Sequence, residues 1–116
     1  MSTTATIHDL HRWQRLAYRA LGDLLSMAER EGLAPCRWSV GPHLNLVGEP
    51  NAIDNDAKRS TYETWMTALS ADVRSAVVDS AGIERLSAVA DVLVEDMRVQ
   101  VVLRATIVPA DDEAGV

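Results

Sequence analysis

The chain has 116 residues, and 47% of them are hydrophobic, which suffices for one domain with a packed core and excludes a largely disordered protein. Its formal net charge is −6, and this acidic balance argues against generic DNA or RNA binding, because nucleic-acid binders usually offer the phosphates a basic surface. Residues 1–50 hold five basic and five acidic side chains, whereas residues 51–116 hold six and twelve, so the second half carries the whole excess.

Several features favour a cytoplasmic, bacterial protein with a single domain, residues 1–116. No stretch approaches the ~18 apolar residues that cross a bilayer, and the N-terminus lacks the basic and apolar pattern of a signal peptide. One cysteine, Cys36, excludes an internal disulfide and fits a reducing cytosol. Lys58 is the only lysine among 11 basic residues, a bias typical of GC-rich bacterial genomes. We expect residues 1–6 and 110–116 to be flexible tails.

The first predicted element is a helix from Ile7 to Glu31. Apolar residues recur there at intervals of three and four, which is typical of a helix that packs one broad face on a core. These residues are Leu10, Trp13, Leu16, Ala17, Ala20, Leu21, Leu24, Leu25, Met27 and Ala28. Gly32 suits the left-handed residue after a helix and Pro35 blocks continuation, so the helix end is well marked.

The opposite face of this helix carries a basic stripe, which consists of His8, Arg12, Arg15 and Arg19. Exposed cations near a helix start oppose the helix dipole, at a cost of about a few tenths of a kcal/mol each. The simplest interpretation is a solvated face on which Arg19 pairs with Asp23, four residues further along. The alternative is a docking surface for an acidic partner or a phosphate backbone.

A first hairpin and a second helix follow. Strand-forming residues at Cys36–Val40 and His43–Val47 flank Gly41-Pro42, and this predicts a hairpin. Its inward residues would be Trp38, Val40, Leu44 and Leu46. The second helix, over residues 56–70, is preceded by capping side chains. Its apolar residues are Ala57, Tyr62, Trp65, Met66 and Leu69. Residues 71–84 are ambiguous and predict either an extension of this helix or a loop.

The clearest strand pattern lies in residues 85–108, which predict a β-hairpin that organises the rest of the chain. From Met97 to Ile107 the odd-numbered residues are apolar, as expected of a strand with one buried face. Leu86 to Val94 is also strand-like, with its even-numbered residues on one face. Glu95-Asp96 is the natural turn between the two strands, because aspartate tolerates turn geometry.

Three apolar residues, Val89, Leu93 and Val102, lie on the other face of this predicted hairpin. Ordinary surface scatter or a second covered face would explain them. Because exposed apolar patches often mark interfaces, we also consider them a dimer contact.

The elements together predict an α+β fold, a two-layer sandwich of order α-β-β-α-β-β. A four-stranded antiparallel sheet covered on one face by two helices is the simplest way to bury both hairpins and both helices.

No residue set points to a specific chemistry. His8, His11, Cys36 and His43 lack the spacing of a zinc motif. Cys36 with His43 would supply only a thiol and a base, and a small buried hydrophobe is the default role of a cysteine. Phosphate-binding and dinucleotide-binding glycine motifs are absent from the sequence. We therefore predict no catalytic, cofactor or metal site and no enzymatic activity.

Parts of the first two thirds of the chain resemble a family of small uncharacterised actinobacterial proteins. These parts are Leu24-Leu25, Gly32-Leu33-Ala34-Pro35, Trp38-Ser39-Val40, Leu46-Val47-Gly48 and Trp65. The resemblance concerns structural motifs and implies no activity. In outline, the acidic helix-and-sheet plan is also similar to small dimeric secretion-chaperone-like folds, which is an analogy of fold alone.

The leading functional prediction is a non-catalytic cytosolic module, an adaptor or chaperone-like protein, that binds another protein and forms a homodimer without a cofactor or a membrane. One alternative is a DNA-associated regulator that uses the basic stripe. The other is a small-ligand-binding domain with a site near Trp38, His43 and Trp65.

Overall fold

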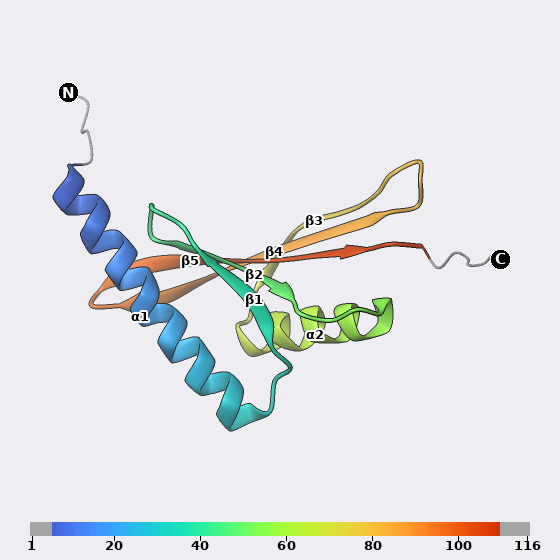
Figure 1. Cartoon of the computed structure of the whole chain (residues 1–116), viewed down its shortest axis with the longest axis horizontal. Helices are drawn as coiled ribbons and strands as arrows, with labels where there is room; N and C mark the ends of the chain where they lie inside the picture. Colours follow the sequence, from blue (N-terminus) through green and yellow to red (C-terminus); the bar gives the residue numbers. More distant parts are fainter. Residues whose placement is uncertain (1–5, 110–116) are drawn as a thin grey trace.

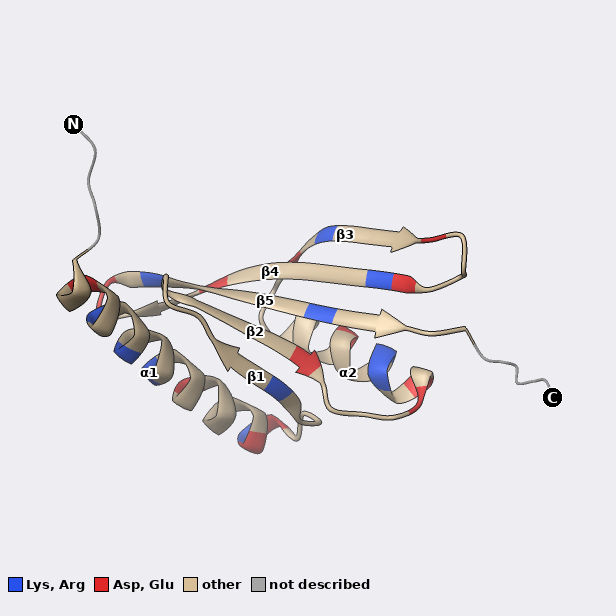
Figure 2. Ribbon diagram, turned by 45° about the horizontal axis from the view of Figure 1, so that its top comes forward, with Lys and Arg blue, Asp and Glu red and all other residues tan. Residues whose placement is uncertain are grey.

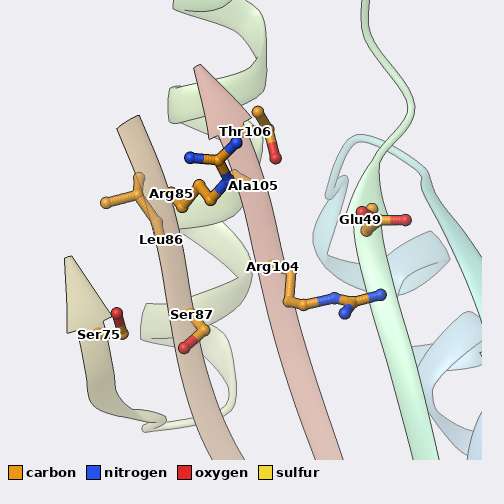
Figure 3. A pocket seen from close by; sticks show the side chains of 8 residues that line it. All are labelled: Glu49, Ser75, Arg85, Leu86, Ser87, Arg104, Ala105 and Thr106. Atoms are coloured by element: carbon orange, nitrogen blue, oxygen red, sulfur yellow. The ribbon is translucent and has the colours of Figure 1, made fainter. Parts of the chain in front are cut away.

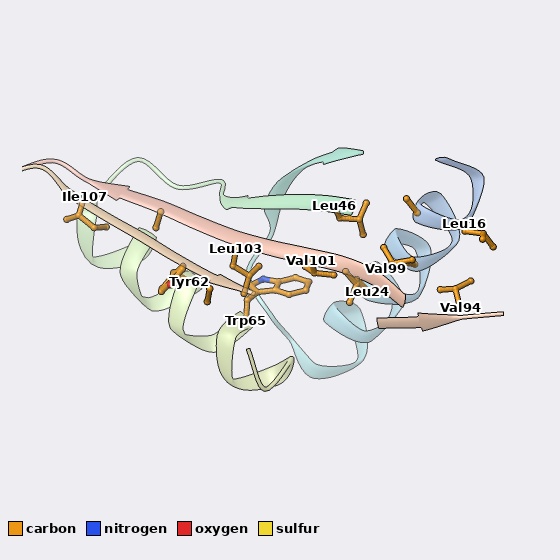
Figure 4. Packing of buried hydrophobic residues seen from close by; sticks show 14 residues of the cluster. Leu16, Leu24, Leu46, Tyr62, Trp65, Val94, Val99, Val101, Leu103 and Ile107 are labelled. Carbon is orange, nitrogen blue, oxygen red and sulfur yellow. The ribbon is translucent and has the colours of Figure 1, made fainter. Parts of the chain in front are cut away.

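The structure, a computed structural model, describes residues 6–109, which form two helices and one five-stranded sheet (Figure 1). The elements in chain order are α1 (Ile7–Glu31), β1 (Cys36–Val40), β2 (Asn45–Pro50), α2 (Asn55–Ala68), β3 (Asp72–Val78), β4 (Glu84–Val94) and β5 (Met97–Ile107). Both helices pack on the same face of the sheet, the inner face (Figure 4). The other face carries no helix within residues 6–109, and we call it the open face. The α+β class and the two-layer plan are therefore as predicted.

The sheet differs from the prediction in strand number and in direction. Its strand order is β1-β2-β5-β4-β3, so there are five strands where four were predicted. β2 and β5 run parallel, whereas the other neighbouring pairs are antiparallel, so the sheet is mixed. The prediction of a purely antiparallel sheet was wrong because β5 inserts between β2 and β4, and no local sequence pattern encodes that neighbour.

The additional strand, β3, comes from the segment that was predicted to be helix or loop. Val73 pairs with Ala88 and Ala76 pairs with Leu86, while a register shift leaves Arg74 as a bulge between them. A bulge inserts one extra residue, so two side chains three positions apart share the inner face. This spacing imitates a helix, which is why the alternation of a strand is hidden in the sequence.

The β4–β5 hairpin confirms the strongest prediction. The two strands pair without a shift from Glu84 opposite Ile107 to Val94 opposite Met97. Glu95 and Asp96 form the turn with φ of 50° and 66°, a left-handed pair that matches the twist of a two-residue hairpin even without glycine. The buried inner-face residues are Ala88, Ala90, Val94, Val99, Val101, Leu103, Ala105 and Ile107.

Helix α1 has the predicted boundaries, and both ends are capped. The Thr6 N–H donates to Asp9 Oδ2 at 3.2 Å and the Asp9 N–H donates to Thr6 Oγ1 at 3.0 Å, which forms a capping box. Hydrogen bonding of the Asp9 carboxyl group to the Thr6 backbone N–H, and then to the Thr6 side chain, lowers the pKa of Asp9. Gly32 has φ 69°, the left-handed conformation expected after a helix. Thr6 is thus a capping residue rather than part of a tail, and the remaining predicted tail residues, 1–5 and 110–116, lie outside the described residues.

Helix α2 and the first hairpin also follow the prediction, with shifted ends. Asp54 caps α2, and its Oδ1 accepts from the Ala57 N–H at 2.7 Å. The helix ends at Ala68, two residues before the predicted Ser70. β2 begins at Asn45 rather than His43 and extends to Pro50. The predicted inward residues of this hairpin, Trp38, Val40, Leu44 and Leu46, all belong to the core or pack against it.

Candidate interaction surfaces

The open face of the sheet is mostly polar, with one apolar row across its centre. Val47 is the partner of Val102 on β5, and Val102 is in turn the partner of Val89 on β4. A polar row made of Asn45, Gln100 and Asp91 lies on one side of this apolar row, and Arg104 with Ser87 lies on the other. A solvated antiparallel sheet ordinarily has such a polar face. The apolar row is therefore the part of the open face best suited to contact another protein.

The three residues predicted as a dimer contact do all lie on this face, but they do not form one patch. Val89 and Val102 are adjacent cross-strand partners and are half-buried. Leu93 lies further along β4, opposite Arg98, and is 68% exposed. The structure places these side chains where a second protein can reach them, and their role as a dimer contact stays a prediction.

A shallow hollow of about 330 Å³ lies on the open face beside the apolar row (Figure 3). Its polar lining comes from four strands and comprises Glu49, Ser75, Arg85, Ser87, Arg104 and Thr106. Arg85 Nη1 lies 2.7 Å from Asp79 Oδ2 in an ion pair, and the Arg104 side chain extends toward the strand that carries Glu49 (Figure 3). Both guanidinium groups thus have a carboxylate in the neighbourhood, so the hollow is a polar surface with balanced charge.

The basic stripe of α1 divides into two parts. Arg19 forms an ion pair with Glu95 in the β4–β5 turn, so the predicted pairing with Asp23 was wrong. The prediction failed because a residue 76 positions away, which the fold brings alongside, competes with the neighbour on the same helix. Arg12 and Arg15 make none of the ion pairs found within residues 6–109, and they line a hollow of about 390 Å³ with His8 and His11. Figure 2 shows these cations along the first half of α1.

Strand β3 is the surface that sequence reasoning missed. Val73, Val77 and Val78 are 59%, 54% and 62% exposed, although they lie on both faces of the strand. The helices do not reach this edge: α2 packs mainly on β5 and β2, and α1 packs mainly on β4. The valine content of the segment was a signal for a strand, but the bulge at Arg74 obscured it.

The predicted small-ligand position, between the helices and the sheet, is filled by packed side chains. Trp65 is 1% exposed, and its Nε1–H donates to the Ala34 carbonyl at 2.7 Å. Its ring meets Trp38 edge to face, with centroids 5.3 Å apart. Trp38 in turn covers Gly48, where an added Cβ would lie 2.6 Å from the indole ring. His43 lies apart from this pair, with its ring centroid 6.1 Å from that of Trp13. These aromatic side chains are core packing elements.

The residues weighed for metal or nucleophilic chemistry are not brought together. Within residues 6–109 no group of three or more His, Cys, Asp and Glu side chains is placed to hold a metal ion. Cys36 is half-buried on β1, and this burial raises the pKa of its thiol to about 11. A thiol with so high a pKa is a poor nucleophile at neutral pH.

Comparison of the chain with protein-family models, with curated proteins and with solved structures found no match. Within residues 6–109 no helix is both long enough and apolar enough to span a membrane. The resemblance to small actinobacterial proteins therefore stays a prediction.

Proposed function

We propose that the protein is a non-catalytic interaction module that forms a homodimer and binds another protein through surfaces of its sheet. One observation carries the proposal: both helices lie on the inner face, which leaves the apolar row of Val47, Val89 and Val102 and the nearby Leu93 on the open face. Sheet surfaces that a chain does not cover itself are common sites of protein contact.

The chemistry of the described side chains supports a binding role. The one thiol is held protonated by burial, and the indoles between helices and sheet are packed against each other. The hollow on the open face is polar, unlike the apolar, concave pockets that usually hold small molecules. The features that remain for function are therefore extended surfaces.

Sedimentation velocity between 5 and 100 µM (about the range in which weak homodimers form) tests the homodimer. A strict monomer over the whole range would contradict this part of the proposal.

The partner surface is tested with Val89→Asp and Val102→Asp, which place charges in the apolar row and leave the core intact. Ile53→Glu is the matched control, because Ile53 is 98% exposed and lies before α2, away from the sheet. A partner recovered with the wild type and the control, but not with either Asp variant, supports the open face as its binding surface.

A second candidate function, association with DNA, rests on the free part of the basic stripe. Arg12 and Arg15 are exposed, are not engaged in ion pairs within the described residues, and flank a hollow with His8 and His11. Two adjacent arginines can neutralise phosphates, and their binding to DNA would weaken steeply with salt. The double variant Arg12→Glu with Arg15→Glu should abolish a salt-sensitive gel shift. An unchanged shift in that variant would remove this function.

A further inference from the structure

We infer that the homodimer forms along the free edge of β3, which pairs antiparallel with β3 of a second copy. The two five-stranded sheets then become one continuous sheet of ten strands across a two-fold axis. This inference rests on the homodimer of the proposed function and assigns its contact to a different surface from the predicted Val89, Leu93 and Val102.

The edge of the sheet at β3 is exposed. A strand at the end of a sheet leaves every second backbone N–H and C=O without a strand partner, and natural proteins usually protect such edges with charges, proline or a covering element. From Ser75 to Val78 the strand has no charged residue and no proline, and two of its four residues are valines that are more than half exposed. The opposite edge, β1, has five residues and is backed by α1. Of the two sheet edges, β3 is therefore the one more available for pairing with a strand of another chain.

The side-chain faces of β3 restrict the register in which two copies can pair. Ser75 and Val77 lie on the open face, where their partners are Ser87 and Arg85, whereas Ala76 lies on the inner face. With Ala76 on the two-fold axis, Ser75 of each copy lies opposite Val77 of the other, and each pair shares one face. A slip by one residue would oppose an open-face residue to an inner-face residue, so the alternation excludes such a slip. Among the registers that keep the faces matched, an axis at Ala76 uses the charge-free residues Ser75, Ala76 and Val77 of both copies.

The charges of β3 favour antiparallel over parallel pairing. Arg74 is the only cation of β3, and Asp79 follows the strand at its other end. In the antiparallel register Arg74 lies opposite Val78 of the second copy and next to its Asp79, the carboxylate that also pairs with Arg85 of its own chain. A parallel arrangement would place the two Arg74 residues side by side, and like charges on neighbouring strands are destabilising.

The contact joins two copies of the chain and cannot add a third. The bulge at Arg74 lies at the end of the paired segment and opposite Val78 of the second copy, which limits regular pairing to Ser75–Val77. Because the contact uses the same residues on both copies, it joins two chains and leaves no second β3 edge free for a third. On the inner face it brings the exposed Val78 of each copy beside the axis, next to Ala76 of both copies.

The first experiment uses pairs of charges at positions that would face each other only in this dimer. In the double variant Ser75→Asp with Val77→Asp, the aspartate at 75 of each copy would lie opposite the aspartate at 77 of the other. The dissociation constant of the dimer, measured by sedimentation velocity, should rise by about tenfold or more. In Ser75→Lys with Val77→Asp the same positions carry opposite charges between the copies, and the dimer should be restored. Arg85 is the partner of Val77 within each chain, so both variants place the new aspartate beside the same cation.

The second experiment uses disulfide trapping in a Cys36→Ser background. Residues directly opposite in an antiparallel pair have Cα atoms about 4.5–5.5 Å apart, within the range of a disulfide. Ala76→Cys should therefore form a covalent dimer under mild oxidation, and Leu93→Cys, an equally accessible position on the open face, should not. Covalent dimers with Leu93→Cys alone, or a dimer unaffected by the two aspartates, would overturn the β3 contact and leave the homodimer standing. A wild-type protein that stays monomeric up to 100 µM, which means a dimer Kd weaker than about 10⁻⁴ M, would overturn both the β3 contact and the homodimer.

Discussion

Strands β5 and β3 are both rich in valine, yet the fold treats them in opposite ways. On β5 the side chains of Val99, Val101 and Leu103 are at most 1% exposed, because β5 lies in the middle of the sheet and both helices pack on it. On β3 the valines are between 54% and 62% exposed, because β3 lies at the edge, beyond the reach of the helices. The same residue type thus supplies the core in one strand and a surface in the other.

The difference between the two strands shows that an alternating sequence pattern indicates which face of a strand the chain covers. Polar and apolar residues alternate on β5 because the chain itself covers one face and water covers the other. On β3 the chain covers neither face, and exposed valines lie on both, Val73 and Val78 on the inner face and Val77 on the open face. An edge strand with valines exposed on both faces is therefore evidence for a covering element that the chain does not supply.

The largest expected effect comes from truncating matched residues of the two strands. Leu103→Ala removes a side chain that is 1% exposed and should lower the free energy of unfolding by about 2–5 kcal/mol, since it leaves a cavity in the core. Val77→Ala, on the 54% exposed side chain, should change it by at most about 0.5 kcal/mol. Urea unfolding below the concentration at which the protein dimerises measures both. If the two variants lost comparable free energies of unfolding, β3 would have to be covered within a single chain.

A smaller effect is expected where β2 carries a glycine on the inner face. Gly48→Ala would place a Cβ 2.6 Å from the ring of Trp38, which is itself held edge to face against Trp65. The indoles must shift to make room, and overpacking of this kind costs about 1–3 kcal/mol. Val47→Ala, the neighbour on the open face, is the control and should cost less. Tryptophan fluorescence should report a changed indole environment in Gly48→Ala, and an unaltered spectrum with full stability would show that this layer has free space.

The elements that the sequence predicted well are those with local signals. Gly32 and Pro35 end α1, and the alternation from Met97 to Ile107, joined by the Glu95-Asp96 turn, defines the central hairpin. In each case neighbours in the chain determine the geometry, so the pattern is visible without the fold.

The features that escaped prediction depend on residues far apart in the chain. The bulge at Arg74 turned the alternation of β3 into helix-like spacing, and the parallel pairing of β2 with β5 joins segments about 55 residues apart, such as Leu46 and Val101. Of the candidate surfaces, the sequence placed Val89, Leu93 and Val102 together on one face, but it gave no indication that β3 would form an exposed edge.

The smallest expected effect concerns the way β3 is held to the sheet. β3 is held by its pairing with β4 and by the turn that joins the two strands. In this turn Asp79 accepts hydrogen bonds from the Ala81 N–H at 2.9 Å and the Ile83 N–H at 3.1 Å and pairs with Arg85 at 2.7 Å. The hydrogen bond from Arg85, followed by that from the Ile83 backbone, lowers the pKa of Asp79 below its ordinary value of 3.8. A carboxylate with a lowered pKa in the folded state stabilises the fold above its ordinary pKa, and this contribution is lost as the pH falls through the folded value.

Acidification below pH 3.8 should therefore release β3 before the central strands. Amide hydrogen exchange, corrected for the intrinsic dependence on pH, should show protection lost at Val77 and Val78 while Val101 stays protected. Asp79→Asn should remove this difference between low and neutral pH, because the amide cannot titrate. If β3 and β5 lose protection together at low pH, the edge strand does not open separately from the core, and the contrast between the two strands is one of exposure alone.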